Sequence, residues 1–295
     1  MSQADTAART ATAPYGPRPQ TPLGVLALFR SELSITFRRL RTLALLTILA
    51  ALPVLIGVVV KIETGDGEDG GGGPAFIAQI TQNGLFLVFT ALAVTLPVFL
   101  PMAVAVVAGD SVAGEASSGT LRYLLVAPAG RTRLLIAKFC ASLVFCAAAT
   151  LTVALAALTT GAALFPLGRV TLLSGDTVSF GEALLRAALI AGAVAASLAG
   201  VVAIGLFVST MTSSGIAAMA TTVGIVITVQ ILGGIPQLHT IQPWLFPHYW
   251  LSFADLLRQP MYLDDVLRNL GLQGGYVAVF GAAAWARFGA RDITS

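Results

Sequence analysis

Three side chains in a charged, turn-rich stretch are spaced to meet a soluble partner. Glu115, Gly119 and Arg122 occur at i, i+4 and i+7 within residues 109–138, between two long apolar segments. A short helix here would carry a carboxylate, a bare backbone patch and a guanidinium on one face. Such a face can dock on another protein through charge-assisted hydrogen bonds. The alternative is an ordinary loop whose charges only keep it in water.

Other chemistries lack the residues that they need. The glycine-rich stretch KIETGDGEDGGGG at residues 61–73 has no Gly-Lys-Ser/Thr ending, so we expect a flexible linker and no phosphate-binding loop. Cys140 and Cys146 share one apolar run, and His239 and His248 have no third ligand in a recognisable pattern, so no disulfide framework and no metal site are predicted. No Gly-x-Ser-x-Gly elbow occurs. The sequence therefore predicts no enzyme activity and no cofactor in this chain.

The composition is that of an integral membrane protein. Hydrophobic residues make up 56% of the 295 positions, charged residues 11%, and the mean hydropathy is +0.86, whereas soluble domains carry roughly a quarter charged residues. We expect an all-α polytopic membrane protein that lies in a lipid bilayer and binds no nucleic acid. About 20 apolar residues cross a bilayer, and six segments qualify, the second of them kinked by Pro97 and Pro101. They are residues 43–60, 84–108, 134–165, 187–208, 215–235 and 270–288.

The segment before the first span predicts a helix that lies in the membrane interface. Residues 1–21 are rich in Ala, Thr and Pro and predict a disordered tail, and Thr21 and Pro22 then begin a helix. Across residues 22–41 an apolar stripe lies opposite a stripe that contains Arg30, Arg38 and Arg41. Guanidinium groups opposite an apolar face are typical of an interfacial amphipathic helix; alternatively, they are a basic flank that orients the first span.

The distribution of positive charge predicts the orientation. Twelve of the 17 lysines and arginines lie in the N-terminal 41 residues, in residues 109–138 or at the C-terminal end, which contains Arg287 and Arg291. Since cytoplasmic loops carry the excess of Lys and Arg, both termini and residues 109–138 are predicted to be cytoplasmic.

An aromatic segment precedes the last span on the opposite side. Residues 236–268 are interrupted by prolines and are too short to cross the bilayer twice. They predict a re-entrant pair of short helices in the outer leaflet, or else a fixed aromatic belt. As a candidate outer gate we take Trp244, Phe246, Tyr249 and Trp250.

The stretch GEASSGTLRYLLVAPAGRTRLLIAKF resembles the segment that follows the second span in type-2 ABC exporter permeases. In that family a Glu is followed by Gly-Thr-Leu, a short leucine-rich helix, a Pro, a basic turn and a Lys at the start of the third span. The residues that match are Glu115, Gly119, Thr120, Leu121, Pro128, Arg131 and Lys138. The interfacial helix, the six spans and the outer re-entrant pair fit the same family.

The resemblance implies a function and a set of partners. Residues 42–295 would be a permease domain in a bacterial plasma membrane, paired with an identical or paralogous permease. Two separate subunits would bind ATP and Mg and hydrolyse ATP. The contact that couples them to the permease would be formed by Glu115, Gly119, Thr120, Leu121, Arg122 and Arg131.

The resemblance also implies a substrate cavity between the two permeases, lined by the second and fifth spans. Candidate lining residues are Asn83, Phe86, Phe89 and Gln230. An apolar path without fixed charges suits an amphiphile, such as a lipophilic drug or a lipid. A channel or membrane scaffold that needs no ATPase is the alternative function.

Overall fold

The computed structural model describes residues 22–65, 75–119, 130–172 and 174–290. Across these residues the chain is mainly helical, which confirms an all-α polytopic membrane protein. Five segments in this part of the chain are long and apolar enough to cross a membrane: Leu40–Thr64, Phe99–Ser117, Arg131–Leu164, Phe180–Met211 and Gly215–Gly233.

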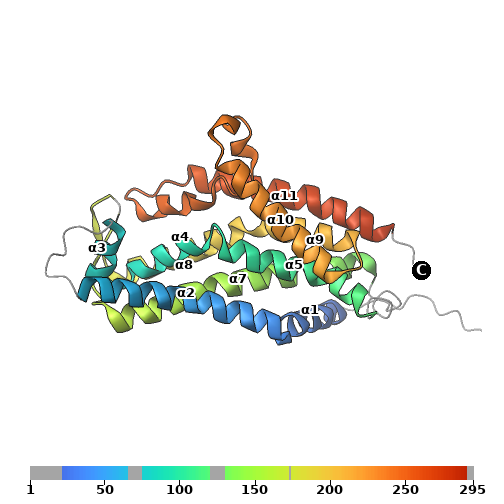
Figure 1. Cartoon of the computed structure of the whole chain (residues 1–295), viewed down its shortest axis with the longest axis horizontal. Coiled ribbons are helices and arrows are strands. Elements are labelled where there is room, and N and C mark those ends of the chain that lie inside the picture. The colour runs from blue at the N-terminus through green and yellow to red at the C-terminus, as the bar shows by residue number, and fades with distance from the viewer. Residues whose placement is uncertain (1–21, 66–74, 120–129, 173, 291–295) are drawn as a thin grey trace, which may run out of the picture.

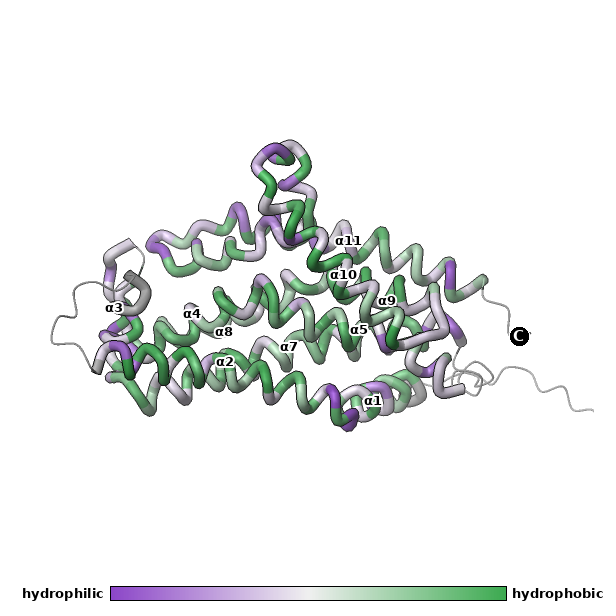
Figure 2. Tube along the Cα trace, viewed as in Figure 1, coloured by the Kyte–Doolittle hydropathy of each residue, from purple (hydrophilic) through white to green (hydrophobic). Residues whose placement is uncertain are grey.

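The helices form one elongated bundle (Figure 1). Helix α5 (Phe99–Ser117) packs on α7 (Arg131–Leu164), α9 (Ala199–Met211) and α10 (Gly215–Gly233), while α2 (Leu40–Gly65) lies along α7. Helix α8 (Phe180–Ser197) joins α9 through a break at Leu198. Figure 2 shows hydrophobic residues along the bundle helices and hydrophilic residues mainly toward the ends, as expected for a membrane-spanning bundle.

The helix at the predicted sixth span is present but is more polar than the other five. Helix α11 (Asp264–Gly289) packs along α9. Its 26 residues are long enough for a span, but it is not among the five apolar candidates. Asp264, Asp265 and Arg268 in its first turns lower its hydropathy, and Asn269, Gln273 and Arg287 lower it further along the helix. Six spans therefore remain a prediction.

The second predicted span has the expected kink but a different end. It consists of α4 (Phe86–Thr95) and α5, which are separated at residues 96–98 around Pro97, whereas Pro101 lies within the first turn of α5. Helix α5 then continues to Ser117, which corrects the prediction of a loop from residue 109. Hydrogen bonds to α9 hold this extension in place. Ser209 Oγ, on α9, accepts them from the backbone N–H groups of Val112 and Ala113.

The N-terminal segment is two helices with a change of direction. Helix α1 (Pro22–Arg38) ends before Arg39, and α2 begins at Leu40, so residues 22–41 are not the single predicted helix. Figure 1 shows α1 at an angle to α2, at the end of the bundle where the C-terminus also lies. Helix α3 (Ala75–Gln82) lies at the opposite end.

The segment before α11 is formed by 3₁₀ turns. They are η2 (Pro236–Leu238), η3 (Gln242–Trp244) and η4 (Trp250–Leu257); whether they enter a membrane leaflet is a prediction. A short antiparallel hairpin, β1 (Val170–Thr171) with β2 (Thr177–Val178), was not predicted. It forms because Val170 and Val178 pair in register and are both buried.

Candidate functional site

Six charged side chains meet where α1, α2, α5 and α7 converge. This charge cluster contains three carboxylates and three cations, and its members come from four elements and the α1–α2 junction. They are Glu32, Arg39, Arg41, Asp110, Glu115 and Lys138. The formal charges of the six residues balance, as the burial of several ionised groups in one place requires.

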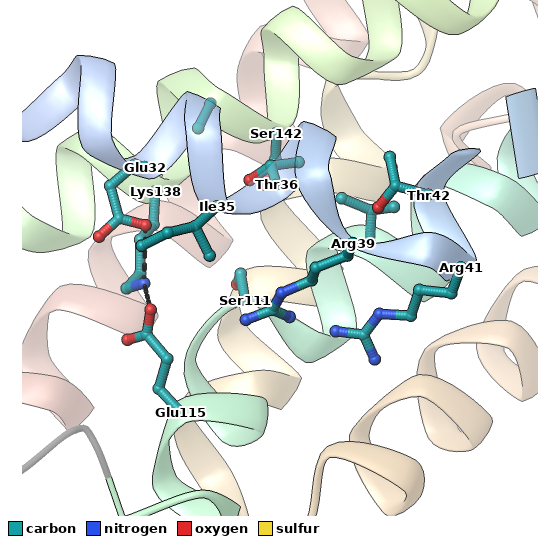
Figure 3. A pocket seen from close by; sticks show the side chains of 12 residues that line it. Glu32, Ile35, Thr36, Arg39, Arg41, Thr42, Ser111, Glu115, Lys138 and Ser142 are labelled. Carbon is teal, nitrogen blue, oxygen red and sulfur yellow. Dashed lines mark hydrogen bonds and ion pairs between the residues drawn. The ribbon is translucent and has the colours of Figure 1, made fainter.

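Lys138 lies at the centre of one half of the charge cluster. Its Nζ donates to Glu32 Oε2 at 2.9 Å and to Glu115 Oε1 at 2.5 Å, as Figure 3 shows. All three side chains are buried, with exposed fractions of 3% for Glu32, 4% for Glu115 and 3% for Lys138. One ammonium therefore ties α1, the end of α5 and the first turns of α7 together.

Asp110 is the centre of the other half. Arg39 and Arg41 both form ion pairs with Asp110 Oδ2. Two glycines leave room for this carboxylate: a Cβ at Gly215 would lie 2.5 Å from Asp110 Oδ1, and a Cβ at Gly114 would also collide with the Asp110 carboxylate. The ion pairs to Asp110 therefore join the α1–α2 junction to α5, and the absence of a side chain at Gly215 lets α10 lie close to the Asp110 carboxylate.

A small cavity lies between the two halves. Its volume is about 20 Å³, and its lining includes Thr36, Ser111 and Ser142 together with members of the charge cluster. A cavity must offer at least about 10–15 Å³ to hold one water, so there is room for a water and not for a substrate. Glu32 Oε1 is buried and has no hydrogen-bond partner among the described residues. The charge cluster therefore connects four helices and does not form a substrate site.

The structure changes the expected arrangement of the coupling residues. Glu115 lies in α5 and is bonded inside the chain, and Gly119 has φ +73° beyond the end of that helix. Glu115 and Gly119 are therefore not on one continuous helical face, which corrects the expected i, i+4, i+7 face. Arg131 donates to the Gly289 carbonyl at 2.7 Å. The predicted coupling residues Thr120, Leu121 and Arg122, with Pro128, lie outside the described residues, as does the predicted tail at residues 1–21.

The predicted interfacial arginines separate into two groups. Arg30 and Arg38 are exposed, whereas Arg41 belongs to the charge cluster. Sequence reasoning missed Glu32, Arg39 and Asp110. A signal for Glu32 was available, because it is the single acidic residue of residues 22–41. A lone carboxylate among arginines indicates a specific ion pair within the chain.

The predicted pathway residues lie within the fold of this chain. Phe86 and Phe89 are buried in the core with ring centroids 5.7 Å apart. Asn83 is buried and donates to the Gly168 and Arg169 carbonyls. Gln230 donates to the Pro97 carbonyl, which the break between α4 and α5 leaves available. None of these side chains lines the cavity bordered by Trp244, Leu272 and Val279 or the cavity bordered by Ile204, Met211 and Val229.

The four aromatic residues of the predicted outer gate also differ from one another. Phe246 and Trp250 are buried, and Trp250 Nε1 donates to the Ser197 carbonyl at 2.9 Å. Tyr249 is half-buried, and Trp244 is 73% exposed. Phe246 and Trp250 therefore anchor the segment to the bundle, and only Trp244 and Tyr249 retain surface for another role.

A buried polar network at the α8–α9 break was also missed. Gln273 donates to the Phe246 carbonyl and to Asn269 Oδ1, and it accepts from the Gly200 N–H. Asn269 donates to Ser197 Oγ at 2.6 Å. Amides at i and i+4 within a mostly apolar helix were the available signal. The network joins α11 to the α8–α9 break and to the segment before η4.

Comparison with known proteins gives a family and no function. The family model described as "Protein of unknown function (DUF2705)" matches residues 54–294. No curated protein matches the chain. The matched range includes Asp110, Glu115 and Lys138, while Glu32, Arg39 and Arg41 precede it.

Proposed function

The chain belongs to the family described as protein of unknown function (DUF2705), and from its own residues we propose that it is the permease subunit of an ATP-driven exporter of the type-2 ABC class. It forms half of a translocation pathway with a second permease, identical or paralogous. Two separate subunits bind ATP and Mg and hydrolyse ATP. The proposal includes six spans, a bacterial plasma membrane and cytoplasmic termini.

The observation that carries the proposal is the pairing of Glu115 with Lys138 across residues 118–130. Glu115 precedes this segment on α5, and Lys138 follows it on α7. Their ion pair, with Glu32 of α1 on the same ammonium, makes the three helices one mechanical unit at this end of the bundle. A force applied to residues 118–130 by an ATPase would move α5 and α7 together.

This geometry changes the role proposed for Glu115. Its carboxylate is buried and bonded to Lys138, so its role is to hold the base of the coupling segment. The docking contact itself is assigned to the residues that follow, Gly119, Thr120, Leu121 and Arg122, with Arg131 at the far end. Gly119 and Gly130 both have φ +73°, a conformation that favours glycine, so the segment leaves α5 and reaches α7 through defined turns.

The proposed substrate is an amphiphile such as a lipophilic drug or a lipid. Support comes from composition, because the cavity bordered by Trp244, Leu272 and Val279 and the cavity bordered by Ile204, Met211 and Val229 are lined mainly by apolar and aromatic side chains. The proposed pathway lies between two permeases, so a single chain forms only half of its walls.

Affinity purification from a mild detergent extract tests the proposal. We expect a polypeptide with a phosphate-binding loop to co-purify, with ATP hydrolysis that the permease stimulates. Leu121→Asp should lose this polypeptide, whereas the control Leu167→Asp, an exposed leucine outside the coupling segment, should retain it. If neither the parent protein nor the control retains an ATPase, the exporter proposal is wrong and a channel or scaffold becomes the better function.

A further inference from the structure

An apolar cleft runs along one face of α11. It has a volume of about 690 Å³, within the range of about 300–1,000 Å³ usual for ligand sites. One wall is a stripe on α11, and the other is the segment that contains η3. The lining is Pro243, Trp244, Tyr249, Arg268, Gly271, Leu272, Gly275, Tyr276, Val279 and Phe280.

The length of the cleft matches one leaflet of a bilayer. Arg268 and Val279 are eleven positions apart on α11, and a rise of 1.5 Å per residue gives about 17 Å. Half of a hydrocarbon core of about 30 Å is about 15 Å. Between these two residues the α11 wall is formed by Gly271, Leu272, Gly275 and Tyr276, so an extended acyl chain would meet bare backbone and apolar side chains.

One end of the cleft is lined by Arg268, and Asp265 lies beside this end, outside the lining. The two side chains form an ion pair of 3.1 Å, and both are substantially exposed. Trp244 and Tyr249 border the same cleft, and aromatic side chains of this kind are typical of headgroup depth. A headgroup with a phosphate and a primary ammonium would complement Arg268 and Asp265 together, whereas a purely anionic headgroup would meet the Asp265 carboxylate.

We propose that this cleft is a binding site for one phospholipid of the phosphatidylethanolamine type. The phosphate lies on the Arg268 guanidinium, the ammonium lies on the Asp265 carboxylate, and one acyl chain lies along Gly271, Gly275 and Val279. The site requires α11 to lie in the membrane, which is part of the proposal above, but it does not depend on export, because every residue that forms it belongs to one chain.

Two glycines make the site testable without disturbing the fold. A Cβ at Gly275 or at Gly281 would meet no atom within 4 Å, but only Gly275 lines the cleft. Gly275→Phe should therefore fill the cleft, and Gly281→Phe is its matched control. Arg258 forms an i, i+3 ion pair with Asp255 and lies outside the cleft, so Arg258→Gln is the control for Arg268→Gln.

The experiment is native mass spectrometry of the purified chain, without any ATPase, after incubation with equal amounts of phosphatidylethanolamine and phosphatidylglycerol in detergent. We expect one phosphatidylethanolamine to be retained in preference to phosphatidylglycerol. Arg268→Gln should lower retention about tenfold, the loss typical of one charge-assisted partner, and Gly275→Phe should abolish it, with both controls unchanged. Retention of the two lipids in equal amounts, preference for phosphatidylglycerol, or full retention by Gly275→Phe would overturn the proposal.

Discussion

Replacing Lys138 by methionine tests whether the charge cluster holds the helices together electrostatically. Methionine keeps most of the side-chain volume but removes the ammonium that bonds Glu32 at 2.9 Å and Glu115 at 2.5 Å. Two buried carboxylates would then lose the ammonium that neutralises them and would repel each other. Removing one partner of a buried ion pair costs about 3–5 kcal/mol, and we expect a cost at the upper end because one ammonium serves two carboxylates.

Thermal unfolding in detergent, followed with a thiol-reactive dye, measures this effect. The buried thiol of Cys146, which is 1% exposed, becomes reactive when the bundle opens. At about 2–4 °C per kcal/mol, the expected fall in Tm is on the order of 10 °C or more. Lys61→Met is the matched control, since Lys61 is the other lysine of the chain and is exposed. Its ammonium lies 5.8 Å from the Phe165 ring centroid, a contact worth about 0.5–1 kcal/mol.

A triple variant separates charge from packing. Lys138→Met combined with Glu32→Gln and Glu115→Gln removes all three charges, so most of the stability lost in the single variant should return. The electrostatic explanation is refuted if Lys138→Met unfolds at the same temperature as Lys61→Met. It is also refuted if the triple variant recovers nothing, because the loss would then reflect packing alone.

Three further variants test the packing around the sites. Gly215→Ala should destabilise the protein by about 1–3 kcal/mol because its Cβ would lie 2.5 Å from the Asp110 carboxylate. Its control is Gly224→Ala, whose Cβ would meet no atom within 4 Å and which should leave Tm unchanged or raise it. Equal changes in Tm for the two variants would contradict the geometry. Asn83→Leu removes two hydrogen bonds to loop carbonyls, so backbone hydrogen exchange at residues 167–169 should accelerate at least about fivefold. Unchanged exchange would show that the amide does not hold this loop. Trp250→Phe keeps a ring but removes the indole N–H donor, and a loss of about 1 kcal/mol in unfolding free energy is expected, measured as a lower Tm with the same dye.

The helices could be predicted from the sequence, but their ends and partners could not. Apolar runs interrupted by Pro97 and by Gly233 and Gly234 locate the helical segments, because chain length and hydropathy are local properties. The extension of α5 to Ser117 is not local. It depends on Asp110 and Glu115 being neutralised by residues that are distant in sequence: Glu115 lies 23 residues from Lys138, and Asp110 lies 71 residues from Arg39.

The faces of the helices were hard to predict for a different reason. In a membrane protein, lipid-facing and core-facing positions are both apolar, so periodicity does not separate them. Phe86 and Phe89 were therefore assigned to a pathway although both are buried in the core. Polar residues within apolar segments carried more information: Asn83, between α3 and α4, and Asn269 and Gln273, in α11, each bond a backbone carbonyl or another buried side chain.

The two glycine turns at the ends of residues 120–129 have a practical consequence for protein engineering. Among the described residues, no atom lies within 4 Å of the position of a Cβ at Gly119 or Gly130, and the helices on either side are already held together by Glu115 and Lys138. Residues 120–129 can therefore be exchanged for those of another family member, with the flanking glycines and the ion pair retained. On the docking role proposed above for this segment, such chimaeras would acquire the partner of the donor protein while the bundle is unaltered.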